Sequence, residues 1–305
     1  MWLVVALSGY FLLAVVAILD KFIVSDERLA PSVVTFFSSA PLLALVFLLP
    51  FGVNSLHSWH DALIGLISGA AFVCALWTMY RGFESSEVSH AGPLIGAVVP
   101  LATLALSSWF FPGNVSSRLL TAIGFLVVGS LVISFEQKKQ ASGWHRGMLW
   151  IIMAGIFFAA SNIAAKYMYN VYGFYAGLVW TRLAMGIVGL LLLPLPRVWK
   201  SLHGTRKKSV IRHRFSSTST KVITVVLDKT FGVVGAVLVQ YAIALGSVTL
   251  VNALTGIQYA FLIVLVAMSS KLFPKLFKEE YTRTEIFQEI MAVACIGVGL
   301  ALLIV

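Results

Sequence analysis

The apolar run WLVVALSGYFLLAVVAILDKFIV, residues 2–24, decides the fold class of this chain. An α-helix rises 1.5 Å per residue, so about twenty apolar residues cross the roughly 30 Å hydrocarbon core of a bilayer. The run lacks the basic start and the small-residue cleavage site of a signal peptide. It is therefore predicted to be a membrane helix, and nine similar runs follow it.

Composition extends this prediction to the whole chain. The 305 residues are 59% hydrophobic and 11% charged, whereas soluble domains are roughly half apolar and about a quarter charged. Backbone groups cannot stay unpaired in lipid, so helices are the economical form for these runs. The sequence thus predicts an all-α, multi-pass integral membrane protein, in the plasma (inner) membrane if the source is bacterial.

Turn-forming residues divide the apolar runs into ten spans. Pro112-Gly113-Asn114 and Gly173 are clear breaks, whereas Gly246-Ser247 carries the weakest turn signal. The predicted spans are 2–24, 32–50, 60–80, 88–111, 118–135, 147–168, 173–196, 225–246, 249–272 and 285–305.

Lysine and arginine residues predict the orientation of these spans. Most of the 22 lie in loops after odd-numbered spans, including a long basic loop near 197–224. Such loops are cytoplasmic by the positive-inside rule, which places both termini outside. Membrane orientation therefore accounts for the net charge of +10, and no nucleic-acid partner is expected. Cys74 and Cys295 lie inside apolar runs, which disfavours a disulfide or a thiolate metal site.

The second half of the chain repeats the first. Residues 14–22, AVVAILDKF, align with residues 159–167, AASNIAAKY, and the breakers keep their order and spacing in both halves. This divides the chain into two five-helix units, 1–140 and 141–305. Since five is odd, the second unit enters the membrane from the opposite side, and an inverted repeat follows. Inverted repeats are a recurrent basis of alternating access.

A family resemblance is carried by two further features. Asp20-Lys21 closes the first span, with Lys166 as its counterpart, and the passage YRGFESSEVSHAGP, residues 80–93, leads to Pro100. On these residues the chain resembles the drug/metabolite transporter superfamily, specifically the EamA-like transporters with two five-helix repeats. The resemblance covers nearly the whole chain and implies a central cavity lined by spans one to four and six to nine. One departure is Phe261, which stands in the ninth span where the fourth has Pro100.

Arg182 is the principal candidate for solute contact. It lies about nine residues into the seventh span, hence ~13 Å along the helix axis, where a charge costs several kcal/mol unless it is paired or hydrated. Two interpretations are open. Arg182 binds an anionic group of a solute, or it has a structural role, pairing with a carboxylate or reaching outward to the interface.

Other polar and aromatic side chains join Arg182 as candidates. Asn162 and Lys166 are four residues apart and share a helix face. Each candidate also has a structural alternative: amides hydrogen-bond neighbouring helices, aromatic rings pack or anchor at the interface, and a lysine reaches toward the headgroups. The predicted solute-binding residues are Arg182, Asn162, Trp180, Lys166, Gln240, Tyr241 and Gln258.

Charged residues near span ends, and small residues within spans, receive other roles. Glu84, Glu87 and His90 form either a proton relay or a solvated cap, and Asp228 with Lys229 is predicted to be an interfacial anchor. The glycines expected to permit close helix contact are Gly92, Gly96, Gly186 and Gly189.

No motif for enzyme chemistry is found in the sequence, and neither a cofactor nor a metal is expected. The predicted function is a secondary transporter or exporter of a small organic metabolite, with a preference for a carboxylate or phosphate. Two alternatives are a divalent-cation carrier or channel, which needs carboxylates at membrane depth, and a non-transporting scaffold or lipid-binding protein. The expected partners are the solute and membrane lipid. Proton or counter-solute coupling, and a monomeric or homodimeric state, stay open.

Overall fold

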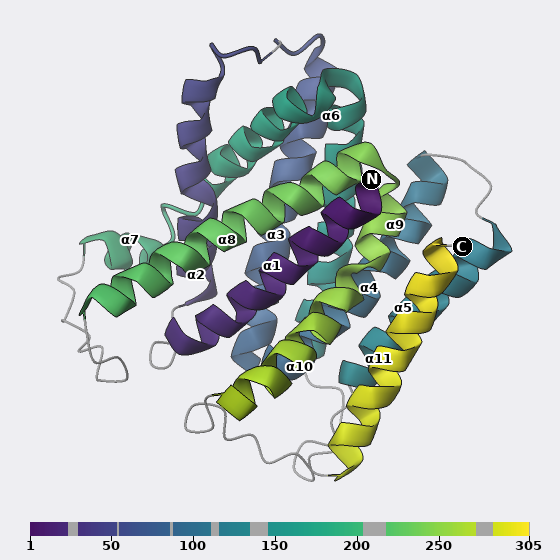
Figure 1. The fold of residues 1–305 in the computed structure, drawn as a ribbon. Helices are drawn as coiled ribbons and strands as arrows, with labels where there is room; N and C mark the ends of the chain where they lie inside the picture. The colour runs from purple at the N-terminus through teal and green to yellow at the C-terminus, as the bar shows by residue number, and fades with distance from the viewer. Residues whose placement is uncertain are drawn as a thin grey trace.

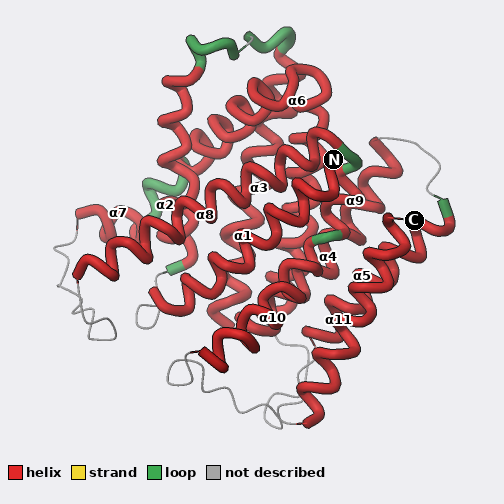
Figure 2. The backbone as a smooth tube through the Cα atoms, viewed as in Figure 1, coloured by secondary structure: helices red, strands yellow, loops and turns green. Residues whose placement is uncertain are grey.

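The computed structural model describes residues 1–23, 30–53, 55–85, 88–110, 116–134, 146–203, 218–272 and 283–304. This part of the chain is helical with short turns, and no strand occurs in it (Figures 1 and 2). Its elements are α1 (Trp2–Ile23), α2 (Pro31–Ser39), the 3₁₀ helix η1 (Ala40–Leu48), α3 (Trp59–Ser85), α4 (Val88–Phe110), α5 (Ser117–Ser134), α6 (Arg146–Leu190), α7 (Pro196–His203), α8 (Thr218–Leu245), α9 (Val248–Ala253), α10 (Thr255–Leu272) and α11 (Arg283–Ile304).

Six segments of the described chain are long and apolar enough to cross a membrane. They are Trp2–Leu19, Pro31–Leu48, Trp59–Glu84, Gly147–Leu190, Val226–Leu245 and Val248–Val266. Three shorter apolar helices accompany them: Pro93–Ser108, Ser117–Val132 and Ile290–Leu302. An all-helical integral membrane protein is therefore confirmed at this level.

The longest helix, α6, contains two of the predicted spans. Gly173 interrupts it with φ 77° and ψ 168°, a backbone conformation that a glycine adopts without steric cost. The break predicted at Gly173 is thus present as a kink within α6. The weaker break at Gly246-Ser247 is confirmed, because α8 ends at Leu245 and α9 begins at Val248.

Two predicted spans are not single α-helices. The second, 32–50, is α2 followed by the 3₁₀ helix η1, and the change occurs beside Pro41. A proline ring clashes with the carbonyl four residues before it and supplies no N–H, so the α-helix cannot continue. The ninth, 249–272, is divided into α9 and α10 at Leu254, although no proline stands there. The seventh, 173–196, ends earlier than predicted, at Leu190.

Glycines lie where the helices pack most closely. The extensive pairs are α3 with α6, α1 with α8, and α5 with α11. Gly9 of α1 meets Gly235 of α8, and Gly129 of α5 meets Ala292 of α11. Small residues allow this approach, and dispersion contacts then hold the helices together in lipid.

The close contacts predicted for three glycines are confirmed. Gly186 lies against Leu43 of η1, Gly189 against Ser39 of α2, and Gly96 against the ring of Tyr259. The surroundings of Gly92 lie outside the described residues.

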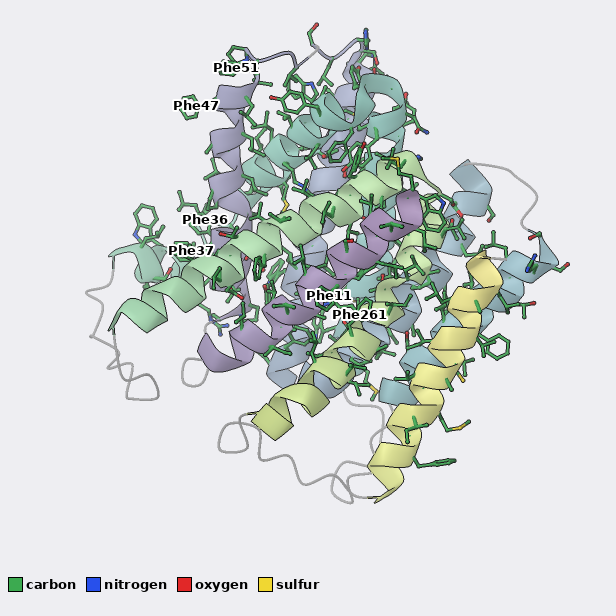
Figure 3. The ribbon with its side chains drawn as sticks, viewed as in Figure 1. Phe11, Phe36, Phe37, Phe47, Phe51 and Phe261 are labelled. Carbon is green, nitrogen blue, oxygen red and sulfur yellow. The ribbon has the colours of Figure 1, made fainter. Side chains whose placement is uncertain are left out.

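Aromatic rings also join the helices of the two halves. Phe11 of α1 contacts Phe261 of α10 edge to face, with ring centroids 5.6 Å apart (Figure 3). Phe47 and Phe51 point away from the bundle in the same view and are exposed, as residues facing lipid or a headgroup region would be. Both termini lie toward the upper part of Figure 1, since α1 descends from the N-terminus and α11 rises to the C-terminus.

Candidate functional site

Arg182 lies at the middle of the bundle. It stands midway along the second part of α6, and its guanidinium carbon is 5.0 Å from the ring centroid of Phe72, which is midway along α3. Nη1 also lies 3.8 Å from the sulfur of Met185. The side chain keeps partial exposure, so it is not fully covered by neighbouring side chains.

The predicted alternative of a carboxylate partner for Arg182 is not found within the described residues. The phenol of Tyr169, in the first part of α6, is near enough to interact electrostatically with the guanidinium. The groups in contact with the guanidinium are a ring face and a thioether, and neither neutralises its charge.

A ladder of hydrogen bonds lies next to Arg182 and begins at Tyr169. The Tyr169 hydroxyl donates to Oε1 of Gln240 at 2.7 Å, and Nε2 of Gln240 donates to Oδ1 of Asn162 at 3.2 Å. Nδ2 of Asn162 donates to Oδ1 of Asn252 at 3.0 Å, and Nδ2 of Asn252 donates to Oγ1 of Thr103 at 2.9 Å. We call these five residues the polar ladder.

The polar ladder connects four elements through buried side chains. It takes residues from α6, α8, α9 and α4, and all five side chains are buried. Both the oxygen and the nitrogen of every amide in it have a partner. Unpaired amides are expensive away from water, so mutual pairing stabilises the crossing of these helices. The structural alternative offered for Asn162 and Gln240 is thus present in the structure, beside the predicted site.

The other predicted site residues lie at varying distances from this centre. Tyr241 stacks at a tilt on Phe174, with centroids 4.9 Å apart, and Phe174 in turn contacts Tyr169 at 5.5 Å. Trp180 packs in a cluster with Met168 and Tyr172. Gln258 is half-buried on α10, and no hydrogen bond is found for it within the described residues.

The ammonium group of Lys166, a residue of α6, lies at the C-terminal end of α8. Its ammonium donates to the main-chain carbonyl of Ala244 at 2.9 Å, one residue before α8 ends at Leu245. The last carbonyls of a helix have no partner within the helix, and a cation there also interacts favourably with the helix dipole. Lys166 therefore closes α8 from a neighbouring helix, a role that sequence reasoning did not anticipate.

A second polar cluster surrounds Asp61 at the start of α3. Ser58 caps α3, since the Asp61 main-chain N–H donates to Ser58 Oγ, and the same hydroxyl donates to the Asp61 carboxylate. The hydroxyls of Tyr167 and Tyr172 donate to the same carboxylate at 3.0 and 2.6 Å. The backbone N–H of His57 completes the cluster by donating to the Tyr172 hydroxyl.

Sequence reasoning missed Asp61, although a signal for part of it was present. The spacing Ser58-x-x-Asp61 before an apolar run is the sequence signature of a capping box. The two tyrosines follow about a hundred residues later, so their arrival at Asp61 depends on tertiary packing.

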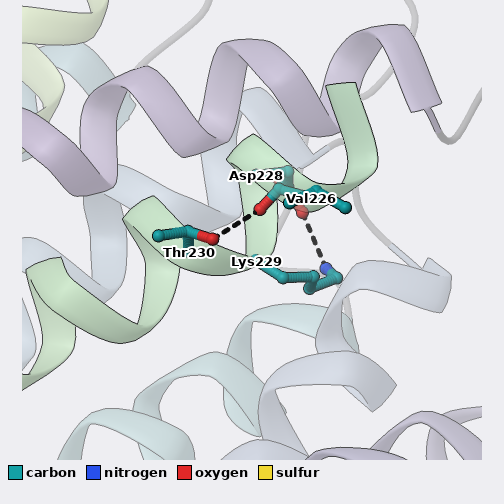
Figure 4. Close-up of polar contacts among 4 residues, drawn as sticks. All are labelled: Val226, Asp228, Lys229 and Thr230. Carbon is teal, nitrogen blue, oxygen red and sulfur yellow. Dashed lines mark hydrogen bonds and ion pairs between the residues drawn. The ribbon is translucent and has the colours of Figure 1, made fainter. Parts of the chain in front are cut away.

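The Asp228 side chain is more deeply buried than is expected for a residue that anchors a helix at the membrane interface. Its side chain is fully buried against the neighbouring helices, whereas that of Lys229 is 74% exposed, and the two form an ion pair at 2.8 Å (Figure 4). Within the described residues neither carboxylate oxygen accepts a hydrogen bond from another group. Lys229 fits the predicted anchor; Asp228 does not. The side chains of Asp20 and Lys21, at the end of the adjacent α1, lie outside the described residues.

Of the three groups proposed as a relay or cap, only Glu84 is described. It is exposed at the end of α3, as a solvated cap would be. Glu87 and the side chain of His90 lie outside the described residues. Among the residues that are described, no group of three or more histidines, cysteines and acidic residues lies close enough to hold a metal ion.

Comparison with known proteins identifies the fold. The fold has been seen before. Of 27 matching solved chains, one described as "Crystal structure of protein" has a TM-score of 0.66, with 14% sequence identity over 98% of this chain and 96% of the other. No protein-family model matches the sequence, and no curated protein matches it either. At this identity the likeness shows the fold alone.

Proposed function

We propose that this chain is a secondary transporter of a small anionic organic solute, built from ten transmembrane helices in two inverted five-helix units, 1–140 and 141–305. The observation that carries the proposal is Arg182, a partly exposed cation within the apolar segment Gly147–Leu190 that has no carboxylate partner within the described residues. We further propose, from the sequence pattern given above, membership of the EamA-like drug/metabolite transporters.

The energetic cost of Arg182 supports a binding role. A charge at the centre of a bilayer costs about 2.5–3.5 kcal/mol by insertion measurements. A cation–π contact such as that with Phe72 offsets about 0.5–2 kcal/mol. The difference leaves the guanidinium short of stabilisation, which an anionic solute would supply with charge-assisted, bidentate hydrogen bonds.

The sign of this charge also discriminates between solutes. A guanidinium repels a divalent cation in a space of low dielectric, and a carboxylate or phosphate is attracted there. The proposal therefore favours an anionic metabolite over the divalent-cation alternative.

Helix packing supports two equivalent halves. The five segments of the first unit are α1, α2 with η1, α3, α4 and α5, and those of the second are the first part of α6, its second part, α8, α9 with α10, and α11. Each contact can be compared with the contact between the corresponding segments of the other unit. The contact of α1 with α8 then corresponds to that of α6 with α3, and the contact of α1 with α10 corresponds to that of α6 with α4. The contacts of α5 with α11, of α4 with α9 and of η1 with α6 map onto themselves. These matched contacts support the inverted repeats on which alternating access is commonly based.

The polar ladder gives the proposed site a fixed wall. The Tyr169 hydroxyl donates a hydrogen bond to Gln240, and the same phenol lies near Arg182. The ladder therefore holds the phenol in place beside the guanidinium. Because the Tyr169 O–H is already donated to Oε1 of Gln240, the guanidinium of Arg182 supplies the N–H donors for a carboxylate or phosphate.

Flux measurements in vesicles test the proposal. The purified full chain is reconstituted, and uptake of glutamate, citrate and phosphoenolpyruvate is compared with that of glycerol, with and without a proton gradient. The variant Arg182→Gln should lower anion flux about tenfold or more, since a charge-assisted hydrogen bond contributes about 1.5–3 kcal/mol. Arg182→Lys should keep part of the flux, because it retains the charge without the planar fork.

The matched control is Arg118→Gln, which removes an exposed arginine from the first turn of α5. It should transport like the unchanged protein. Equal flux for folded Arg182→Gln and Arg118→Gln would remove Arg182 from the solute path. Failure of every anion to move, with glycerol no different, would contradict the anionic transporter.

A further inference from the structure

A pocket lies between the end of α3 and the start of α6, away from Arg182. Its volume is about 280 Å³, close to the lower end of the range of about 300–1,000 Å³ for ligand sites, and it is partly open. The lining residues are Cys74, Trp77, Thr78, Arg81, Trp150 and Phe157. We call it the α3–α6 pocket.

Arg81 lies between two indole rings in this pocket. Its guanidinium carbon is 5.9 Å from the ring centroid of Trp77 and 5.1 Å from that of Trp150. Both rings lie within cation–π distance of the guanidinium, so aromatic side chains of α3 and α6 hold the cation at the pocket. A guanidinium positioned in this way is suited to recognition of a phosphate group.

Polarity changes along the pocket in the direction of the membrane. Arg81 is near the end of α3, and Cys74 lies two turns deeper, ~10 Å at 1.5 Å per residue. On α6, Trp150 is near the helix start and Phe157 lies two turns deeper. The pocket is therefore cationic and aromatic at its outer end, as side chains at the headgroup level are, and apolar toward the hydrocarbon.

The pocket continues the faces of α3 and α6 that are directed away from the protein core. On α3, Leu63, Leu66 and Ile67 are exposed, and helical periodicity places Cys74, Trp77 and Arg81 on the same stripe. On α6, Leu149, Met153 and Ile156 are exposed, and Trp150 and Phe157 border that stripe. In a membrane-spanning bundle such apolar stripes face lipid. The α3–α6 pocket thus opens to the bilayer, outside the solute path.

We propose that the α3–α6 pocket binds a phospholipid with an anionic headgroup. The phosphate accepts hydrogen bonds from Arg81, and an acyl chain lies along Phe157 and Cys74. A choline headgroup fits less well, because the ring faces of Trp77 and Trp150 that would bind its ammonium already hold the guanidinium. The positive-inside pattern places this end of α3 at the cytoplasmic leaflet, which is rich in anionic lipid.

Native mass spectrometry of the full chain in detergent tests this site. Phosphatidylglycerol and phosphatidylcholine with identical acyl chains are added separately, and glycerol 3-phosphate is added in excess as a headgroup without a chain. The protein should retain phosphatidylglycerol over phosphatidylcholine, and glycerol 3-phosphate should not displace it. Arg81→Gln should weaken phosphatidylglycerol retention about tenfold, as expected for a lost charge-assisted contact, and Arg118→Gln should leave it unchanged.

Each other outcome overturns the proposal. Equal retention of both lipids, or full phosphatidylglycerol retention by Arg81→Gln, would remove the lipid specificity. Displacement by glycerol 3-phosphate would identify a site for free anions in place of a lipid. If Arg81→Gln does not fold, Trp150→Leu removes one of the two stacking rings and should weaken retention in the same direction. None of these readouts depends on transport, so the lipid site and the proposed function can fail separately.

Discussion

Replacing Asn252 with leucine would remove the rung of the polar ladder that joins the two halves of the chain. The side chain is 1% exposed, accepts a hydrogen bond from Asn162 at 3.0 Å and donates one to Thr103 at 2.9 Å. Leucine has the same branched arrangement of heavy atoms as asparagine and a larger volume, so the change removes two hydrogen bonds without opening a cavity.

The expected loss follows from the partners left behind. Nδ2 of Asn162 loses its acceptor, whereas Thr103 still donates to the main-chain carbonyl of Val99 at 2.7 Å. Hydrogen bonds between membrane helices contribute about 0.6 kcal/mol each on average and about 1.7 kcal/mol at most. A buried donor without an acceptor costs about 1–3 kcal/mol in soluble proteins. Asn252→Leu should therefore reduce the free energy of unfolding by about 1–2 kcal/mol.

Unfolding equilibria in lipid bicelles would measure this loss. Asn170→Leu is the matched control, because Asn170 is exposed on α6 and takes no part in the ladder. A double-mutant cycle with Asn162→Leu adds a second test. Removing both partners should cost less than the sum of the single changes, since Asn162→Leu deletes the donor that Asn252→Leu would leave unpaired.

The reasoning would be refuted by a loss for Asn252→Leu no greater than that for Asn170→Leu. Strict additivity of the two ladder substitutions would refute the hydrogen bond between them, even if each destabilised the protein.

Three further substitutions test the packing around the site. Gly69→Ala should lower the free energy of unfolding by about 1–3 kcal/mol, because a Cβ there would lie closer than 3.0 Å to the α6 backbone. Gly124→Ala is its control: a Cβ there meets nothing within 4 Å, so this substitution should be neutral or slightly stabilising in thermal unfolding. Lys166→Met should lower stability by about 1 kcal/mol through the lost cap of α8, and a loss of solute flux at unchanged stability would instead return Lys166 to the solute site. Tyr172→Phe should speed amide hydrogen exchange at the start of α3, since the Asp61 carboxylate loses its shortest hydrogen bond; unchanged exchange there would contradict this role for the hydroxyl.

Local signals predicted much of the helical organisation. The breaks at Gly173 and Gly246-Ser247 are predictable because glycine adopts a positive φ without steric cost and small polar residues favour turns. The break at Leu254 is not predictable from the sequence in this way, since leucine is a good helix former. Propensity is a weak prior when tertiary contacts oppose it.

Site residues were predicted less completely than helices. Arg182 could be chosen from sequence because a charge inside an apolar run is costly wherever the helix packs. That no carboxylate pairs with Arg182 within the described residues could not be predicted, because its neighbours are set by the packing of the other helices. Asn162 and Gln240 were named separately, but nothing in the sequence indicated that they would bond each other across α6 and α8.

The sequence by itself determined that this chain is a helical membrane protein and where most of its helices begin and end. Those properties follow from hydropathy summed over short windows and from residues that break helices locally. Only the tertiary structure decided which face of each helix meets which neighbour. The polar ladder, the Asp61 cluster and the α3–α6 pocket depend on this pairing, because each is assembled from residues on different helices. The rotation and pairing of helices depend on side-chain packing along their whole length.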